Sequence, residues 1–417
     1  MKFIIKGGHH LKGDVTISGM KNAATPIIAA TLLTQEECII KNVPRITDVE
    51  KMLGILQSLG AKASWDDEHT VRICCNNVDI RALDVKAVKS MRSSVLLIGP
   101  LLARFREAEL PEPGGCILGN RSLDDHITAL RMLGVTVEVH EGVYRFSAAS
   151  LQGGLTYTNF SVTATENALM AAALTAQLTT IRLAASEPHV QDLCAILQKL
   201  GVDIQGIGTN TLTIRSTSPL RGAEHTLIPD QIEIGTFAVA AALTHGQLRI
   251  APVVPEHLDV ILLTLQRIGV PWSLHGNVLE VQHSSSALRA FRLQTLPSPG
   301  FPTDLQAPFG VLATQCTGTS LIHDPMYEGR MGYIAELIKM GANAIVADPH
   351  RVVVTGPTPL YGQEIKGLDI RAGATMVIAG LVAQGETVVH EAEKIDRGYE
   401  RIEEKLRGLG ADIQRVE

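Results

Sequence analysis

The sequence predicts an α/β protein of two domains, each built from three repeats that place buried helices inside and sheets outside. Three observations lead to this fold class. The chain has 417 residues, which is long enough for two or three domains. A signature for the end of a helix recurs six times, and a helix that is apolar nearly all round recurs at the same period. Self-similarity at such a period is typical of repeated supersecondary structures.

The first recurring element is an amphipathic helix that ends in an apolar residue, followed by glycine, then by alanine or valine, and then by a strand. A glycine just past the end of a helix supplies a left-handed C-cap. Successive glycines lie between 67 and 74 residues apart. The six copies are Leu59-Gly60-Ala61, Leu133-Gly134-Val135, Leu200-Gly201-Val202, Ile268-Gly269-Val270, Met340-Gly341-Ala342 and Leu409-Gly410-Ala411.

The second recurring element is a helix without a polar face, and such a helix is buried. A short polar turn and a strand follow each copy. One repeat therefore contains a buried helix, a strand, an amphipathic helix and further strands. A solenoid is the alternative, but solenoid helices seldom lack a polar face. The six buried helices are expected at residues 23–34, 93–104, 167–177, 235–244, 303–314 and 372–383.

The repeats also predict the domain boundaries. The fourth buried helix begins near Asp230, after three complete repeats. Residues 21–229 should therefore form one domain, and residues 1–20 should rejoin residues 230–417 to form the second. The chain would then pass between the domains twice.

The loop of residues 111–121 interrupts the second repeat. Its sequence is PEPGGCILGNR, in which prolines stiffen the chain and glycines permit tight turns. Other repeats join strand to helix with a proline four residues before an aspartate, as in Pro44 and Asp48. Here Asp124 follows Pro111 by 13 residues, so the loop is an insertion at a repeat junction. Insertions on one face of a repeat array often mark the binding face.

Cys116 is the residue of this loop that points most clearly to chemistry. Cationic side chains such as that of Arg121 favour a thiolate and make a cysteine reactive. A mobile loop that happens to contain a cysteine is the alternative. The six cysteines of the chain include no C-x-x-C pair, which argues against a zinc site and against a disulfide framework.

Composition excludes several other classes of protein. The net charge of −6 gives no sign of a nucleic-acid partner. The chain has no run of 18 uncharged apolar residues and no signal-peptide core at its N-terminus, so we expect a cytoplasmic protein without a membrane segment. The phosphate-binding and dinucleotide-binding glycine motifs are absent, as is H-E-x-x-H, and His9-His10 is expected to be an exposed pair rather than a metal site.

Each buried helix begins among polar or charged residues. Helix N-termini attract anions, and acidic residues there are expected to act as caps, as at Asp230 and Glu233. Capping cannot explain Lys21, Arg92 and Arg371, because a cation at a helix N-terminus is unfavourable unless an anion joins it. Cationic residues at these helix N-termini predict a cationic site for a substrate that carries phosphate and carboxylate groups. The remaining polar tip residues are Asn22, Ser161, Thr163, Glu166, Asn167, Asp304 and Asp369.

Several stretches from end to end of the chain together carry a family resemblance. They are Ile17-Ser18-Gly19-Met20-Lys21-Asn22-Ala23-Ala24, Met91-Arg92-Ser93-Ser94, Pro113-Gly114-Gly115-Cys116, Phe301-Pro302-Thr303-Asp304-Leu305-Gln306-Ala307, Asp369-Ile370-Arg371-Ala372 and the run from Ile395 to Glu403. On these stretches the chain resembles the UDP-N-acetylglucosamine 1-carboxyvinyltransferases, the enolpyruvyl transferases that open peptidoglycan synthesis.

This resemblance implies an inside-out α/β fold with the active site between two domains. It implies transfer of the enolpyruvyl group of phosphoenolpyruvate to the 3′-hydroxyl of UDP-N-acetylglucosamine, with release of phosphate. The expected partners are these two small molecules only, with no cofactor, no metal, no nucleic acid and no membrane, and the expected state is a monomer. The antibiotic fosfomycin would alkylate the loop cysteine.

The resemblance also implies a role for each matching residue. Cys116 would be the general acid that protonates the methylene carbon of phosphoenolpyruvate, and Asp304 would take the proton of the sugar hydroxyl. Asn22 would contact the sugar. Ligands of phosphoenolpyruvate would be Lys21, Arg92, Arg121, Arg371 and Arg397, and Lys21 and Arg397 would also take part in catalysis. The nucleotide diphosphate would contact Ser161, Val162 and Thr163, and the remaining site residues would be Met326, Arg330 and Asp369.

The chain departs from the family pattern at a few positions, all in the nucleotide and sugar regions. Thr163 replaces a usual glycine, Ser122 a proline, and Met326 a small β-branched residue. Gly329, just before Arg330, replaces an asparagine of the family pattern. Two rival functions are the sister transferase that makes 5-enolpyruvylshikimate 3-phosphate, which lacks the cysteine loop, and a non-catalytic relative that binds nucleotide-sugars and regulates.

Overall fold

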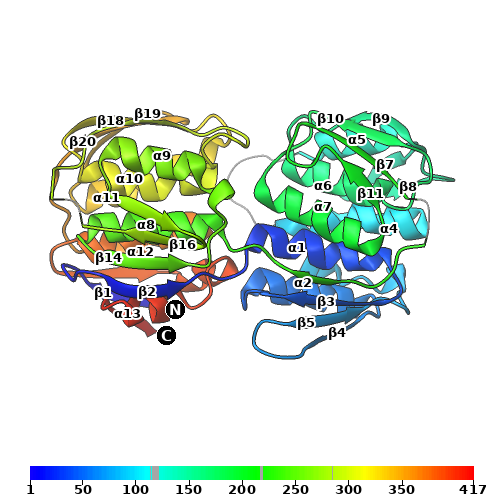
Figure 1. Ribbon diagram of the computed structural model, residues 1–417, viewed down its shortest axis with the longest axis horizontal. Coiled ribbons are helices and arrows are strands. Elements are labelled where there is room, and N and C mark those ends of the chain that lie inside the picture. The colour runs from blue at the N-terminus through cyan, green and yellow to red at the C-terminus, as the bar shows by residue number, and fades with distance from the viewer. Residues whose placement is uncertain (113, 115–121, 217–218, 284) are drawn as a thin grey trace. The chain divides into compact units, whose positions relative to one another are not determined.

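The structure is a computed structural model that describes residues 1–417 except 113, 115–121, 217–218 and 284. Cys116 and Arg121 therefore lie outside the described residues. The chain divides into two compact units (Figure 1). The described residues between Gly19 and Ile228 form unit A, and Met1–Ser18 together with Pro229–Glu417 form unit B.

Three buried helices fill the interior of each unit, as their apolar sequences predict. All 13 residues of α8, for example, are buried. Unit A contains α1 (Lys21–Ala30) with η1 (Thr31–Leu33), η3 (Arg92–Leu97) running into α4 (Ile98–Phe105), and α6 (Val162–Ala172). Unit B contains α8 (Gln231–Leu243), η5 (Thr303–Leu305) running into α10 (Gln306–Thr314), and α12 (Ile370–Val382).

The third buried helix begins earlier than the sequence pattern predicts. It was expected at residues 167–177, but Ser161 is the N-cap of α6 and its side chain accepts a hydrogen bond from the backbone of Ala164. Glu166 and Asn167 therefore do not stand at the tip of the helix but lie buried within it. The apolar run alone was misleading, because these two polar side chains face the interior.

The amphipathic helices end as the glycine signature predicts. The six glycines of that signature have φ between +85° and +115°, the left-handed region that glycine adopts without strain. These helices are α2 (Thr47–Ser58), α5 (Asp124–Met132), α7 (Pro188–Leu200), α9 (Asp259–Ile268), α11 (Tyr333–Lys339) and α13 (Ile402–Gly408). Shorter helices are η2 (Ile80–Ala82), α3 (Val85–Lys89), η4 (Pro255–His257), η6 (Glu328–Gly332) and η7 (Ala392–Arg397).

Three sheets lie on the outside of unit A, in the orders β13-β3-β5-β4, β11-β12-β10-β9 and β6-β8-β7. Each four-stranded sheet has a parallel pair at one edge and antiparallel pairs elsewhere. The strands are β3 (Glu37–Lys41), β4 (Lys62–Trp65), β5 (Val71–Cys74), β6 (Glu107–Pro111), β7 (Thr136–His140), β8 (Val143–Ser147), β9 (Gly154–Tyr157), β10 (Thr179–Arg182), β11 (Asp203–Gln205), β12 (Thr211–Arg215) and β13 (Glu224–Thr226).

Three four-stranded sheets of the same pattern enclose unit B, in the orders β21-β22-β1-β23, β15-β16-β14-β2 and β17-β18-β20-β19. The N-terminal strand β1 (Lys2–Lys6) lies inside its sheet, antiparallel to both neighbours. The other strands are β2 (Lys12–Thr16), β14 (Gln247–Ala251), β15 (Trp272–His275), β16 (Val278–Val281), β17 (Arg292–Gln294), β18 (Gly318–His323), β19 (Asn343–Asp348), β20 (Arg351–Gly356), β21 (Glu364–Lys366), β22 (Glu386–His390) and β23 (Asp412–Val416).

Candidate active site

Lys21 stands at the first position of α1 in unit A, where a cation needs an anionic neighbour. Asp48 of α2 supplies it, with Oδ2 3.2 Å from the Lys21 Nζ. The Asp48 side chain is 1% exposed, whereas that of Lys21 is 16% exposed. The ammonium group is therefore fixed by a buried carboxylate and still reaches the surface. Asn22 follows it on the same turn and is half-buried.

Arg92 begins η3 in unit A and is also half-buried. Its guanidinium donates to the backbone carbonyl of Ser122 at 3.5 Å, a contact at the long limit for a hydrogen bond. Its charge acts on the nearby His126 of α5. Burial, and then the charge of Arg92, lowers the pKa of His126 to about 3, so this imidazole is neutral near pH 7.

The segment Ser161–Thr163 forms the start of α6, and its three side chains are half-buried. Ser161 caps the helix, and the following backbone N–H groups carry the partial positive charge of a helix N-terminus. Thr163 Oγ1 lies 3.0 Å from His126 Nε2. The arrangement in unit A thus combines two cations with a helix start that favours anions.

Asp304 holds two arginines in unit B. Its carboxylate accepts from Arg330 Nη2 at 2.7 Å and from Arg371 Nε at 3.1 Å. The two arginine side chains are 8% and 6% exposed. Burial is the largest influence and opposes their charged forms, but the surrounding groups, Asp304 first among them, together outweigh it, and the pKa of each guanidinium is raised. Both arginines therefore remain charged, and two positive charges face one carboxylate.

Three other predicted residues lie in unit B, and Asp369 is the one that the structure links to this ion pair. Asp369 is the N-cap of α12 and accepts from the backbone N–H groups of Arg371 and Ala372 at 2.8 and 3.0 Å. Arg397 is the last residue of η7 and is half-buried. Met326 is 37% exposed, so its side chain is available for contact with a ligand.

The chain matches the family described as EPSP synthase (3-phosphoshikimate 1-carboxyvinyltransferase) over residues 5–406. The chain belongs to this family. Curated relatives named UDP-N-acetylglucosamine 1-carboxyvinyltransferase are similar over nearly their whole length. The relative from Koribacter versatilis is 43% identical over 100% of this chain and 96% of its own. The one from Treponema denticola is 41% identical over 99% of each chain.

Solved structures of the family have the same fold. The enolpyruvyl transferase NikO from Streptomyces tendae superposes with a TM-score of 0.91 at 26% identity, covering 100% of this chain and 98% of its own. An EPSP synthase from Acinetobacter baumannii gives a TM-score of 0.73 at 18% identity, with both chains fully covered. The predicted inside-out α/β fold of two domains with three repeats each is confirmed.

One expectation about the helix tips is wrong. Asp230 is indeed the N-cap of α8, since its side chain accepts from two backbone N–H groups of the first turn. Glu233 was expected to act as a cap as well, but its carboxylate accepts from Lys405 Nζ at 2.6 Å and from the backbone N–H of Ser18 at 2.8 Å. No sequence signal joins residues so far apart in the chain.

Sequence reasoning also missed His126 as a residue that contacts the predicted site. It faces Thr163 and Asn167 from the apolar side of α5, and a histidine within an amphipathic helix gives no signal of its own. Glu166, the fifth residue of α6, was the available clue, because a charged residue within an otherwise apolar helix indicates buried polar contacts.

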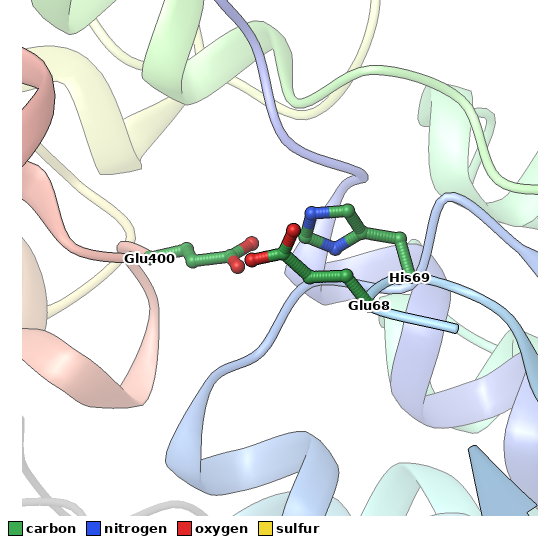
Figure 2. A group of neighbouring side chains, drawn as sticks. All are labelled: Glu68, His69 and Glu400. Atoms are coloured by element: carbon green, nitrogen blue, oxygen red, sulfur yellow. The ribbon is translucent and has the colours of Figure 1, made fainter. Parts of the chain in front are cut away.

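Two acidic residues and a histidine outside the predicted site are shown in Figure 2. Glu68 and His69 belong to the turn between β4 and β5 in unit A, and Glu400 follows η7 in unit B. His69 Nδ1 lies 3.1 Å from the carbonyl oxygen of Val43, and Glu400 accepts from Ser18 Oγ at 3.4 Å. His69 and Glu400 thus each have a hydrogen-bond partner within their own unit.

Among the described residues, no helix is long and apolar enough to span a membrane.

Proposed function

We propose that this protein transfers the enolpyruvyl group of phosphoenolpyruvate to the 3′-hydroxyl of UDP-N-acetylglucosamine and releases phosphate. The observation that carries the proposal is the identity of 41–43% to curated proteins named for this activity, over at least 96% of their length. The likeness to EPSP synthase at 18% identity supports the fold alone. We also propose that the enzyme is a cytoplasmic monomer that begins peptidoglycan synthesis.

The cations of both units suit the donor substrate. Phosphoenolpyruvate carries a phosphate and a carboxylate, and guanidinium groups bind both through paired hydrogen bonds. Lys21 and Arg92 of unit A, with Arg121 and Arg397, are proposed to bind phosphoenolpyruvate, and Arg371 of unit B its carboxylate side. Because Asp48 and Asp304 already hold Lys21 and Arg371 in place, little side-chain ordering remains to be done when the substrate binds.

The reaction needs an acid and a base. In the proposed mechanism Cys116 donates its proton to the methylene carbon of phosphoenolpyruvate, and positive charge develops at the adjacent carbon. The sugar hydroxyl oxygen bonds to that carbon while Asp304 accepts the hydroxyl proton. The methyl group then returns a proton to the Cys116 thiolate as the bond to the phosphate oxygen breaks, the departing phosphate takes up the proton held by Asp304, and the enol ether remains on the sugar. The cations stabilise the departing phosphate.

Four of the five other cysteines are poor candidates for the acid. Cys38, Cys75, Cys194 and Cys316 are buried, and burial raises the pKa of each thiol, to about 12 in the last three. Cations around Cys116 would lower its pKa, but bound phosphoenolpyruvate would offset their charge and keep the thiol protonated. The assignment of the acid to Cys116, which lies outside the described residues, rests on the family resemblance.

A phosphate-release assay tests the proposal. We expect phosphate only when phosphoenolpyruvate and UDP-N-acetylglucosamine are both present, and none when either is omitted. Shikimate 3-phosphate, the acceptor of the sister enzyme, serves as the control and should release none. Phosphate release with shikimate 3-phosphate but not with the nucleotide-sugar would contradict the proposal.

A further inference from the structure

A chain of hydrogen bonds inside unit A ends at the hydroxyl of Thr163. It begins at Asn167, whose Oδ1 accepts from the backbone N–H of Gly99 at 2.7 Å. The Asn167 Nδ2 donates to the carbonyl oxygen of Val95 at 2.9 Å. Only the amide oxygen can accept from an N–H, and only the amide nitrogen can donate to a carbonyl. These two backbone contacts therefore fix the orientation of the buried amide.

The amide in turn fixes the tautomer of His126. The second hydrogen of Asn167 Nδ2 faces His126 Nδ1 across 3.0 Å, so Nδ1 must be an acceptor without a proton. The low pKa of this buried imidazole keeps it neutral, and its single proton then lies on Nε2. The Nε2–H faces Thr163 Oγ1 at 3.0 Å and donates to it.

Thr163 is left with a hydroxyl proton to donate. Its Oγ1 already accepts from His126, and among the described residues this is the only hydrogen bond of that oxygen. The residue is half-buried in the first turn of α6, two positions after the Ser161 cap. Its hydroxyl therefore adds an oriented O–H to a helix start that favours anions.

We propose that Asn167 and His126 are positioning residues that orient the Thr163 hydroxyl to donate to a diphosphate oxygen of UDP-N-acetylglucosamine. The inference rests on the proposed function, together with the expectation from the family resemblance that Ser161–Thr163 contacts the nucleotide diphosphate. Diphosphate oxygens only accept hydrogen bonds, so a hydroxyl that is held as a donor is complementary to them. This relay from Asn167 through His126 needs a hydroxyl at position 163, and Thr163 supplies it in this chain.

The first test compares Thr163→Val, which keeps the shape but removes the hydroxyl, with Thr163→Ser, which keeps the hydroxyl. Calorimetry measures binding of UDP-N-acetylglucosamine, UDP and uridine. We expect Thr163→Val to weaken UDP and UDP-N-acetylglucosamine roughly tenfold or more, as loss of a hydrogen bond to a charged group does. Uridine, which has no phosphate, should bind as before, and Thr163→Ser should stay near wild type. Equal UDP affinity of the valine and wild-type proteins would overturn the proposal.

The second test separates orientation from packing at His126. A glutamine amide can reproduce the Nε2 donor of histidine, whereas the shorter asparagine amide reaches only the Nδ1 position. We expect His126→Asn to raise KM for UDP-N-acetylglucosamine with little effect on KM for phosphoenolpyruvate, and His126→Gln to raise it less. Equal changes in both KM values, or equal effects of Gln and Asn, would overturn the positioning role. If either His126 variant fails to fold, the comparison of Thr163→Val with Thr163→Ser still tests the proposal.

Failure of the inference and failure of the proposed function give different results. If the wild-type protein releases phosphate from the two substrates but Thr163→Val binds UDP normally, only the relay is wrong. If the wild type neither turns over the substrates nor binds UDP, the proposed function is wrong and the relay with it.

Discussion

Asp304 is the residue whose loss should affect unit B most. Its carboxylate neutralises two arginines that are nearly buried, and breaking a buried ion pair on one side leaves an uncompensated charge. We expect Asp304→Asn to lower the free energy of unfolding by about 3 kcal/mol and to abolish most turnover. Denaturant unfolding and steady-state rates would measure both effects.

The matched control is the exposed pair of Asp66 and Arg72, whose atoms lie 2.7 Å apart. Both side chains are more than a third exposed, so solvent screens their attraction and Asp66→Asn should change stability little. A stability loss as large for Asp66→Asn as for Asp304→Asn would show that burial is not the reason for the effect.

Glu166 gives a pH-dependent prediction. Burial, and then the charge of Glu187, raises the pKa of Glu166 well above its ordinary value. The folded state therefore retains a proton that the unfolded state loses, and stability falls as pH rises from about 4.5 towards the folded-state pKa. We expect Glu166→Gln to remove this fall and to be the more stable protein at pH 8. Urea unfolding at pH 5 and pH 8 measures the difference, and an unchanged slope with pH would contradict the assignment.

At the scale of the element, one glycine within α2 and one just after its end have opposite roles. Gly54 lies within the helix and is exposed, and a Cβ there would meet nothing within 4 Å. Gly60 ends the helix at φ +97°, and a Cβ there would lie 2.4 Å from the carbonyl oxygen of Asn77. Alanine at position 54 should stabilise by up to about 1 kcal/mol.

Alanine at position 60 should instead destabilise by at least about 1 kcal/mol, because a side chain in the left-handed region is strained and also clashes here. Thermal unfolding of the two single variants gives a direct comparison within one helix. The repeat model of the fold would be contradicted at this junction if Gly60→Ala were as stable as the wild type.

Periodicity made the elements predictable. The six helix-ending glycines and the six apolar helices each follow from local sequence. A C-cap glycine marks the end of a helix, and a helix without a polar face is buried. The start of α6 was not predictable in the same way, because Glu166 and Asn167 look like tip residues until their buried partners are known. Contacts such as Lys405 with Glu233 join distant segments, and no local pattern contains them.

The candidate site was predicted in part through chemistry and in part through resemblance. Cations at helix starts indicated an anionic substrate, and the carboxylates that fix Lys21 and Arg371 are now visible within their own units. The roles of Cys116 and Arg121 came from resemblance and remain predictions. The link between His126 and Thr163 needed the structure, because a tautomer depends on the hydrogen bonds around the ring.

At the scale of the whole molecule, the N-terminal segment completes unit B. Strand β1 lies between β22 and β23, and β2 pairs with β14. We propose that residues 21–229 are a folding domain and that residues 1–20 belong with 230–417. Deleting residues 2–18 should then leave β22, β23 and β14 each without a neighbour on one edge, and unfold unit B but spare unit A. Hydrogen exchange should show lost protection in 230–417 only, and protection retained there would contradict this division.

The most direct test of the central claim is the mass of the nucleotide-sugar after incubation with the enzyme and phosphoenolpyruvate. Enolpyruvyl transfer predicts that UDP-N-acetylglucosamine gains one carboxyvinyl group, with one phosphate released for each product. Cys116→Ser should slow this by at least about a hundredfold, as loss of a general acid does, while the nucleotide-sugar still binds. An unchanged mass with the wild-type enzyme and both substrates at saturation would contradict the account.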